Sequence, residues 1–365
     1  MKKEGIKING RTLNEILENH NLFLNSRGKE GECGDLSFAN LKGVNLKGVN
    51  LEGANLCNAN LECANLKGAN LKNAKLEYVN LKCAELIDGN LEGVNLYDAN
   101  LEYSNLYNAN LEGVNLLGGN LEGVNLCNAN LRDANLNHAN LKGGNLRYAK
   151  LQYANLEDVE LIGASLEYSN LYNANLEYGN LKNANLELAN LEDADLKGAN
   201  LREANFKDTN LYNACLQDVF LEDAILEGVN LKGANLFRAN LVGAKLKDII
   251  YDHTTLFYQL QCPQEGSFIG YKRARNCIVK LLILEEAKRS SATSRKCRCD
   301  KAKVLAIEHI KTREKVKGVC SDRDRNFIYR VGEIVSVDDF DEDRWKECTT
   351  GIHFFITKEE AKKYV

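Results

Sequence analysis

A leucine stands at every fifth position from Leu36 to Leu246, with Phe206 as the single exception in 43 consecutive quintets. This period excludes one amphipathic helix, a coiled coil and one strand, which bury residues at periods of about 3.6, 3.5 and 2. The residue two positions before each leucine is always small, and the residue directly before it is nearly always Asn. Because alternate residues of an extended stretch point the same way, the small residue and the leucine face inward together. The sequence therefore predicts a solenoid, whose core includes Leu41, Leu61, Leu81, Leu101, Leu121 and Phe206.

Charges at the first position after each leucine indicate how many quintets form one coil. Residues stacked on adjacent coils lie roughly 4.8 Å apart, and like charges at that distance repel. At a separation of four quintets, 13 charged pairs have opposite signs and 6 have the same sign, whereas at three quintets the counts are 7 and 7. The column Lys42, Glu62, Lys82, Glu102 shows the alternation. Four quintets per coil give about 11 coils and a rod of about 50 Å.

The motif Ala-Asn-Leu followed by two variable residues resembles the pentapeptide repeat family. It is seen in Ala54-Asn55-Leu56 and in Ala129-Asn130-Leu131, and the resemblance covers about 215 of the 365 residues. It implies an all-β solenoid, a right-handed four-sided parallel β-helix, over residues 36–250. The resemblance also implies one function, because some members of the family mimic DNA and bind DNA gyrase.

An N-terminal cap is expected before the repeat, because the open end of a β-helix presents unpaired strand groups that template aggregation. Thr12 and Glu15 form a capping box at the start of an apolar stripe with helical spacing. We therefore predict that residues 1–35 are a cap with one helix, and that His20 packs beneath it.

A separate domain is expected after the repeat, because the pattern ends near Ile250. Residues 251–262 are expected to form a linker, and residues 263–365 an α+β domain. Thr357 and Glu360 form a second capping box, for a short final helix. Strands are predicted in the apolar runs Ile278–Leu284, Val304–Ile310, Phe327–Val331 and Ile352–Ile356.

Three stretches of this C-terminal domain look like a module that follows pentapeptide repeats in phage and Gram-positive bacterial proteins. They are 262–270, 289–293 and 351–355. The resemblance identifies the domain and implies no particular activity.

The sequence favours a cytoplasmic protein. Its 12 cysteines are scattered, which is typical of a reducing compartment. The sequence contains neither an apolar run long enough to span a membrane nor a basic leader followed by an apolar run, so no membrane contact is expected.

Cysteines and a histidine of the C-terminal domain are candidates for a zinc site. Cys297 and Cys299 form a C-x-C pair, with Cys320, Cys348 and His353 further along. Zinc sites usually combine two close pairs, and no second close pair follows here. Cys348 and His353 are also candidates for a thiol nucleophile and its base, but no neighbouring residue in the sequence indicates an activated thiol. We expect no metal, no cofactor and no catalytic site.

The surface of the predicted rod is mildly acidic, with 18 basic and 27 acidic residues between positions 36 and 250. One interpretation is mimicry of a nucleic-acid backbone by regularly spaced carboxylates. The other, which we favour, is a solubilising charge on a surface that is otherwise rich in Asn and Gly.

Apolar residues replace polar ones on the outside of the last coils. Such a cluster usually means that something covers it. We predict a docking surface for the C-terminal domain or for a second rod, formed by Cys215, Phe220, Ile225, Phe237, Val242 and Ile250.

A basic segment lies between Lys272 and Lys317, with 15 basic and 5 acidic residues. Such a segment would bind nucleic acid or dock on the acidic rod. The candidate basic patch is Arg295, Lys296, Arg298, Lys301 and Lys303.

The sequence as a whole favours a non-enzymatic scaffold or protein-interaction module. Its C-terminal domain would recognise a protein partner or assemble copies of the chain into a homo-oligomer. Regulation of DNA gyrase by DNA mimicry is the alternative that the family resemblance implies. Binding of nucleic acid through residues 272–317 is a second alternative.

Overall fold

The computed structural model describes residues 6–364 and divides them into two compact units. The first unit contains residues up to Ala234 together with Gly243–Thr254, and the second contains Asn235–Val242 and the chain from Thr255 onward. None of the helices between residues 6 and 364 is long and apolar enough to cross a membrane.

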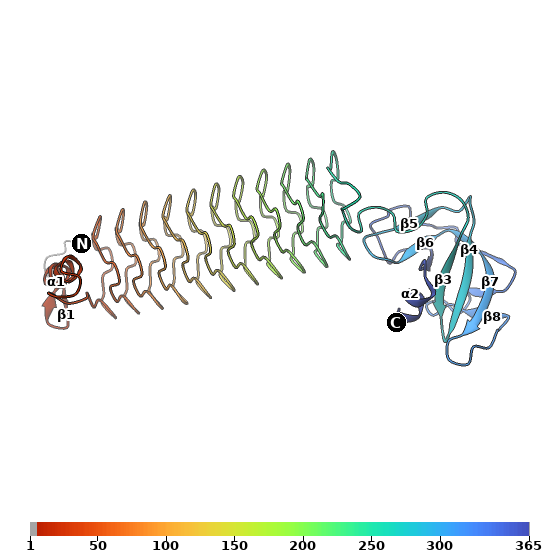
Figure 1. Ribbon diagram of the computed structural model, residues 1–365, viewed down its shortest axis with the longest axis horizontal. Coiled ribbons are helices and arrows are strands. Elements are labelled where there is room, and N and C mark those ends of the chain that lie inside the picture. The colour runs from red at the N-terminus through yellow and green to blue at the C-terminus, as the bar shows by residue number, and fades with distance from the viewer. Residues whose placement is uncertain (1–5, 365) are drawn as a thin grey trace. The chain divides into compact units, whose positions relative to one another are not determined.

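The repeat of the first unit folds as a β-helix with four quintets in each coil. Parallel β-bridges join residues at corresponding places in successive coils, from Asp35 with Asn55 to Asn230 with Ile250. This pairing confirms the four-quintet coil that the charge alternation predicts. Figure 1 shows the resulting series of similar coils, coloured from orange to green.

Leucines and small residues fill the inside of the coils, as the five-residue pattern predicts. Leu41, Leu61, Leu81, Leu101, Leu121 and Phe206 are all 0% exposed. The small residues that share the interior, such as Ala54 and Val94, are equally inaccessible. Burying one leucine side chain contributes roughly 1.5–3 kcal/mol, so this interior is the main source of the rod's stability.

The asparagine before each leucine stabilises both its own corner and the neighbouring coil. Asn70 Oδ1 accepts a hydrogen bond from the Lys72 backbone N–H at 3.2 Å, which fixes the turn after the leucine. Its Nδ2 donates to Asn50 Oδ1 at 3.0 Å, one coil away. Asn90 repeats the contact with Asn70 at 3.1 Å, and Asn110 with Asn90 at 3.2 Å. The asparagines that precede the leucines therefore form a hydrogen-bonded ladder from coil to coil.

The N-terminal helix α1 spans Leu13–Asn25 and follows a two-stranded ribbon of β1, Lys7–Ile8, and β2, Arg11–Thr12. The predicted capping box is present, since Thr12 Oγ1 accepts from the Glu15 backbone N–H at 3.3 Å. His20 is buried, and its Nδ1 accepts a hydrogen bond from the Gly34 backbone N–H at 3.0 Å. This bond joins the helix to the residues that enter the first coil.

The second unit contains an antiparallel sheet in the order β10-β7-β4-β3. The predicted runs 278–284 and 304–310 correspond to its two central strands, whereas its edge strands were not predicted. The four strands are β3, Phe268–Ala274, β4, Cys277–Ile283, β7, Lys301–His309, and β10, Ile334–Ser336.

A smaller antiparallel sheet, a ribbon and a short helix complete this unit. The sheet has the order β11-β6-β5, and the ribbon pairs β8 with β9. Helix α2, Lys358–Lys363, begins after Thr357 with the predicted capping box. The remaining strands are β5, Arg289–Ser291, β6, Cys297–Cys299, β8, Gly318–Cys320, β9, Ile328–Arg330, and β11, Ile352–Phe354.

The boundary between the units differs from the expected linker at 251–262. Asn235 forms a bridge with Leu256, and the Arg238 backbone N–H donates to Thr293 O at 2.9 Å. The rings of Phe237 and Phe257 pack with centroids 4.9 Å apart. Part of the last repeats thus belongs to the second unit, which the leucine period alone does not reveal.

Candidate functional site

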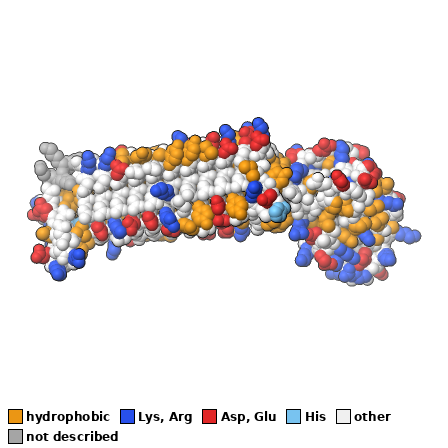
Figure 2. All heavy atoms as spheres, turned by 45° about the horizontal axis from the view of Figure 1, so that its top comes forward, with side chains coloured by type: hydrophobic (Ala, Val, Ile, Leu, Met, Phe, Trp, Pro, Cys, Tyr) orange, Lys and Arg blue, Asp and Glu red, His pale blue; other side chains and the backbone are white. Residues whose placement is uncertain are grey.

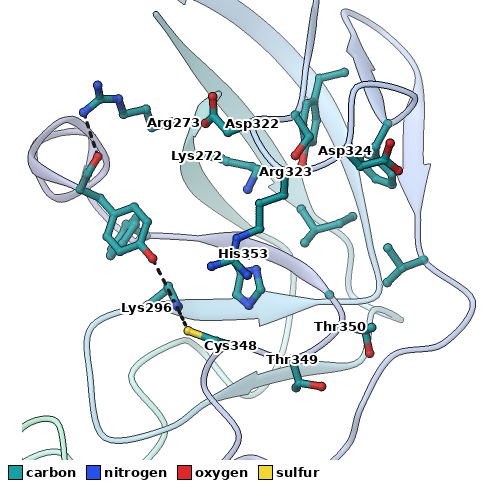
Figure 3. Close-up of a pocket in the computed structure, with 18 of the residues that line it drawn as sticks. Lys272, Arg273, Lys296, Asp322, Arg323, Asp324, Cys348, Thr349, Thr350 and His353 are labelled. Atoms are coloured by element: carbon teal, nitrogen blue, oxygen red, sulfur yellow. Dashed lines mark hydrogen bonds between the residues drawn. The ribbon is translucent and has the colours of Figure 1, made fainter. Parts of the chain in front are cut away.

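The second unit contains a pocket of about 730 Å³. Its walls come from β3, from the residue before β6, from the loop between β8 and β9, from the chain around β11, and from single residues after β10 and α2 (Figure 3). Tyr271 of β3 and Phe355, just after β11, exchange two backbone hydrogen bonds of 2.7 Å. Gly270 permits this approach, because a Cβ there would lie 2.7 Å from the Phe354 ring. The two strands therefore meet at the pocket.

Lys272 of β3 is the most unusual cation of the pocket. Burial lowers its pKa to about 8, although the Asp322 carboxylate acts in the opposite direction. Its Nζ lies 5.9 Å from the centroid of the buried Tyr329 ring. The Lys272 side chain is half-buried, and within residues 6–364 its ammonium group has no hydrogen-bond or ion-pair partner.

Lys296, the residue just before β6, is held in place by two hydrogen bonds. Its Nζ donates to Cys348 Sγ at 3.2 Å and to Tyr364 Oη at 3.4 Å. Burial alone would lower the pKa of Lys296, but the bond to Cys348 and the charge of Glu347 outweigh it, and the pKa is raised. Lys296 therefore carries a full positive charge at neutral pH.

His353 lies at the centre of the labelled side chains in Figure 3. Burial, assisted by the charges of Lys296 and Lys272, lowers its pKa to about 4, so the ring is neutral at pH 7. Its Nε2 lies 3.2 Å from Glu347 O, and only an N–H can donate to a carbonyl. The Nδ1 atom is consequently a hydrogen-bond acceptor.

The candidate zinc and catalytic residues are distributed over several environments. Cys297 and Cys299 are 0% exposed on β6, whereas Cys348 and His353 both line the pocket. Among residues 6–364 no three His, Cys, Asp or Glu side chains are grouped so that they could hold a metal ion. The polar partner of Cys348 Sγ is Lys296, not His353.

The candidate basic patch does not form one exposed surface, contrary to the expectation. Arg298 is 2% exposed on β6, the central strand of its sheet, and Lys296, just before that strand, is 6% exposed. Arg298 donates to the backbone carbonyls of Asp341, Asp343 and Thr350. Arg295 is exposed and pairs with Glu360 at 3.0 Å. Lys303 is exposed and Lys301 half-buried, both on β7.

The candidate docking residues are divided between the two units. Phe220 is 40% exposed and Ile250 49% exposed, whereas Cys215 and Ile225 are half-buried, and all four belong to the first unit. Arg202 covers part of Phe220, with its guanidinium 4.4 Å from the ring centroid. Phe237 and Val242 belong to the second unit and are half-buried.

Charges on the rod pair along columns that run from coil to coil. Carboxylates of one coil contact ammonium or guanidinium groups of the adjacent coil at several places along these columns. Figure 2 shows blue and red side chains intermixed on either side of a broad band of white. Examples are Lys42 with Glu62 at 2.8 Å, Lys72 with Glu92 at 2.9 Å, Lys82 with Glu102 at 2.6 Å, and Arg202 with Glu222 at 3.1 Å.

The pocket cations Lys272 and Arg323 were not among the predicted site residues. Lys272 lies in a strand whose other residues are mixed, and Arg323 lies in a loop rich in charge. The basic segment that begins at Lys272 was the signal for this residue, but the pocket joins segments that are far apart in the sequence, which no local pattern reveals.

Two family models match the chain. Pentapeptide repeats (8 copies) match residues 39–77, 64–102, 80–118, 104–143, 145–177, 180–218 and 214–250. A family of unknown function (DUF5758) matches residues 258–361, which is most of the second unit. No curated protein matches the chain.

Several solved structures are similar to parts of the chain. HetL, a pentapeptide repeat protein involved in heterocyst differentiation regulation from the cyanobacterium Nostoc sp. strain PCC 7120, is 33% identical, covers 58% of this chain and 88% of its own, and has a TM-score of 0.34. The pentapeptide repeat protein Rfr23 from the cyanobacterium Cyanothece 51142 is 41% identical over 26% of this chain and 61% of its own, with a TM-score of 0.19. Full-length QnrB1, a plasmid-mediated fluoroquinolone resistance protein, is 15% identical over 46% of this chain and 92% of its own, with a TM-score of 0.24.

Proposed function

The chain belongs to the pentapeptide repeat family, and on that basis we propose that it is a non-enzymatic interaction protein whose rod supports a C-terminal recognition domain. Pentapeptide repeat proteins are generally structural or interaction proteins, and their fold is a right-handed quadrilateral β-helix. In this proposal residues 1–35 cap a rod of about 11 coils, and the protein acts in the cytoplasm on a protein partner or as a homo-oligomer.

The observation that carries this proposal is the pocket of the second unit. Repeated coils provide a regular surface on which successive positions are alike, whereas the pocket gathers distinct side chains from six segments of the chain. Recognition by pockets of this kind rests on a few convergent polar groups within an apolar wall. We therefore assign recognition to the C-terminal domain and support to the rod.

The paired charges of the rod argue against DNA mimicry. A mimic needs an unbroken array of carboxylates, whereas Glu62, Glu92 and Glu102 each contact a lysine of a neighbouring coil. Such exposed pairs stabilise the rod by only about 0–1 kcal/mol each, but they neutralise the columns in which they lie.

The proposal is tested by comparing the full chain with a truncated chain, residues 1–254, in proximity labelling in the native host. We expect proteins that the full chain labels to be lost with the truncated chain. If the truncated chain keeps the same labelled proteins, the rod is the recognition element and the assignment is wrong.

A gyrase supercoiling assay with both chains tests the alternative. We expect no inhibition at micromolar protein. Inhibition by both chains would place DNA mimicry in the rod and overturn the proposal.

A further inference from the structure

The pocket of the second unit contains more positive charge than its own residues neutralise. Five cationic side chains line it against two carboxylates. One of the carboxylates, Asp322, is already engaged, because its Oδ1 accepts from the Arg275 backbone N–H at 2.8 Å. The lining cations are Lys272, Arg273, Arg275, Lys296 and Arg323, and the carboxylates are Asp322 and Asp324.

Three of these cations have N–H donors without a partner among residues 6–364. Lys272 Nζ and the Arg323 guanidinium have no polar partner within the part of the chain from residue 6 to residue 364. Lys296 uses two of its three N–H groups, for Cys348 and Tyr364. Lys272, Lys296 and Arg323 lie around His353, as Figure 3 shows.

A half-buried ammonium group without an ion-pair partner, such as that of Lys272, is less favourably solvated than one in water. An anion in the pocket would remove this cost by accepting charge-assisted hydrogen bonds from the unused donors. The cavity of about 730 Å³ also exceeds what an inorganic ion needs and falls in the range of small-molecule sites, roughly 300–1,000 Å³.

The remaining wall of the pocket is apolar. Phe327 and Val337 are partly buried and pack on the core of the unit while lining the cavity. Their exposed parts offer a surface for a flat hydrocarbon group next to the cations.

We propose that the pocket binds a small organic anion, with its phosphate or carboxylate head held by Lys272, Lys296 and Arg323 and its flat apolar body against Phe327 and Val337. This inference rests on the proposed function in taking the C-terminal unit as the recognition domain, and it names the class of ligand. The neutral His353 ring, through Nδ1, accepts a hydrogen bond from a hydroxyl or amine of the ligand.

Isothermal titration calorimetry of the full chain with simple probes tests the inference. Phenyl phosphate and benzoate carry both the anionic head and the flat body, inorganic phosphate carries the head alone, and phenol carries the body without the charge. We expect phenyl phosphate or benzoate to bind more tightly than inorganic phosphate, and phenol to show no binding. The stronger of the two organic anions identifies the head group.

Two variants of the pocket and one matched control locate the binding. Lys272→Met removes the charge and keeps the length of the side chain, and Arg323→Gln changes an exposed residue that the fold does not need. Each variant should weaken binding of the best probe about tenfold to a hundredfold, as expected for a lost hydrogen bond to a charged group. Lys303→Met makes the same exchange on the exposed side of β7, outside the pocket, and should leave the affinity within about twofold.

Nuclear magnetic resonance of the histidine side chains provides an independent readout. Binding of an anion should shift the His353 resonances and leave those of His138, on the rod, unchanged. The inference is overturned if no probe binds at millimolar concentration, if phenol binds as well as phenyl phosphate, or if all three variants bind alike. None of these outcomes changes the result of the proximity-labelling experiment. The calorimetry therefore tests the class of ligand, and the labelling tests the recognition role, independently of each other.

Discussion

The second residue after each leucine decides which substitutions a corner tolerates, because its backbone is in the left-handed region throughout the rod. Gly43, Asn58 and Tyr78 have φ values of +64°, +59° and +58°. Left-handed backbone costs roughly 1–2 kcal/mol for most residues, and Asn and Asp adopt it more readily than others. This cost explains why Gly, Asn and Asp are frequent in the slot.

Gly113→Val should expose this backbone cost without any steric contribution. Gly113 has a φ of +64°, and a Cβ built there meets nothing within 4 Å. A β-branched residue is a marked outlier in this region, so we expect a loss of about 1–2 kcal/mol or more, measured as a lower midpoint in urea unfolding. Gly113→Asn, in the same open space, should cost much less. Equal midpoints for the two variants would contradict this explanation.

Phe206→Ala should destabilise the rod by about 3–5 kcal/mol, because it leaves a cavity at a position that is 0% exposed. Phe206→Leu restores the residue found at the other centres, and we expect a cost below about 1.5 kcal/mol. Chemical unfolding followed by circular dichroism distinguishes the two. A similar loss in both variants would mean that the surrounding coils are adapted to the aromatic ring.

At the scale of the element, helix α1 depends on a neutral histidine. Burial lowers the pKa of His20 below its ordinary value, and the Glu52 charge acts in the opposite direction. When the pKa of a histidine is lower in the folded state, the folded protein has its full stability above the unfolded pKa, about 6.5. As the pH falls below this value the unfolded state binds the proton first, so the free energy of unfolding decreases. Protonation of Nδ1 also removes the acceptor for Gly34 N–H.

We therefore expect α1 to lose hydrogen-exchange protection between pH 7 and pH 5, after correction for the intrinsic exchange rate. His20→Asn keeps an acceptor near the position of Nδ1 and does not titrate in this range. In this variant the hydrogen-exchange protection of α1 should be lower than in the wild type at pH 7, but it should not change between pH 7 and pH 5. The explanation fails if the wild-type helix is equally protected at both pH values.

The elements of the rod follow from the sequence, and those of the second unit follow only in part. A five-residue period places each leucine, small residue and asparagine, because every quintet has the same surroundings. The apolar runs of β4 and β7 are also recognisable, but β6 contains only Cys297, Arg298 and Cys299. Burial of Arg298 depends on the backbone carbonyls of Asp341 and Asp343, in a loop distant along the chain, which no local pattern encodes.

At the scale of the whole molecule, the complete coil of four quintets is the unit that can be removed. Deleting residues 101–120 takes out one coil, keeps every side chain on its face, and brings Lys82 beside Glu122, which replaces Glu102. Because each coil contacts only its neighbours, we expect a melting temperature within about 5 °C of the full chain. Circular dichroism measures it.

A slightly shorter deletion provides the control. Removing residues 101–118 takes out less than a whole coil and breaks the five-residue period at one corner. This variant should melt far below the whole-coil deletion. If both deletions melt alike, the coil is not the cooperative unit of the rod.

The asparagine ladder also affects how fast the asparagines of the rod deamidate. Asparagine deamidates when the backbone nitrogen of the next residue attacks the side-chain amide and closes a cyclic imide. In the rod that nitrogen is engaged, as in Leu41, whose N–H donates to Asn60 O at 2.7 Å. The side-chain oxygen is engaged too, as in Asn70, which accepts from the Lys72 N–H. Although the chain is unusually rich in asparagine, these residues are therefore protected from deamidation for as long as the coils stay stacked.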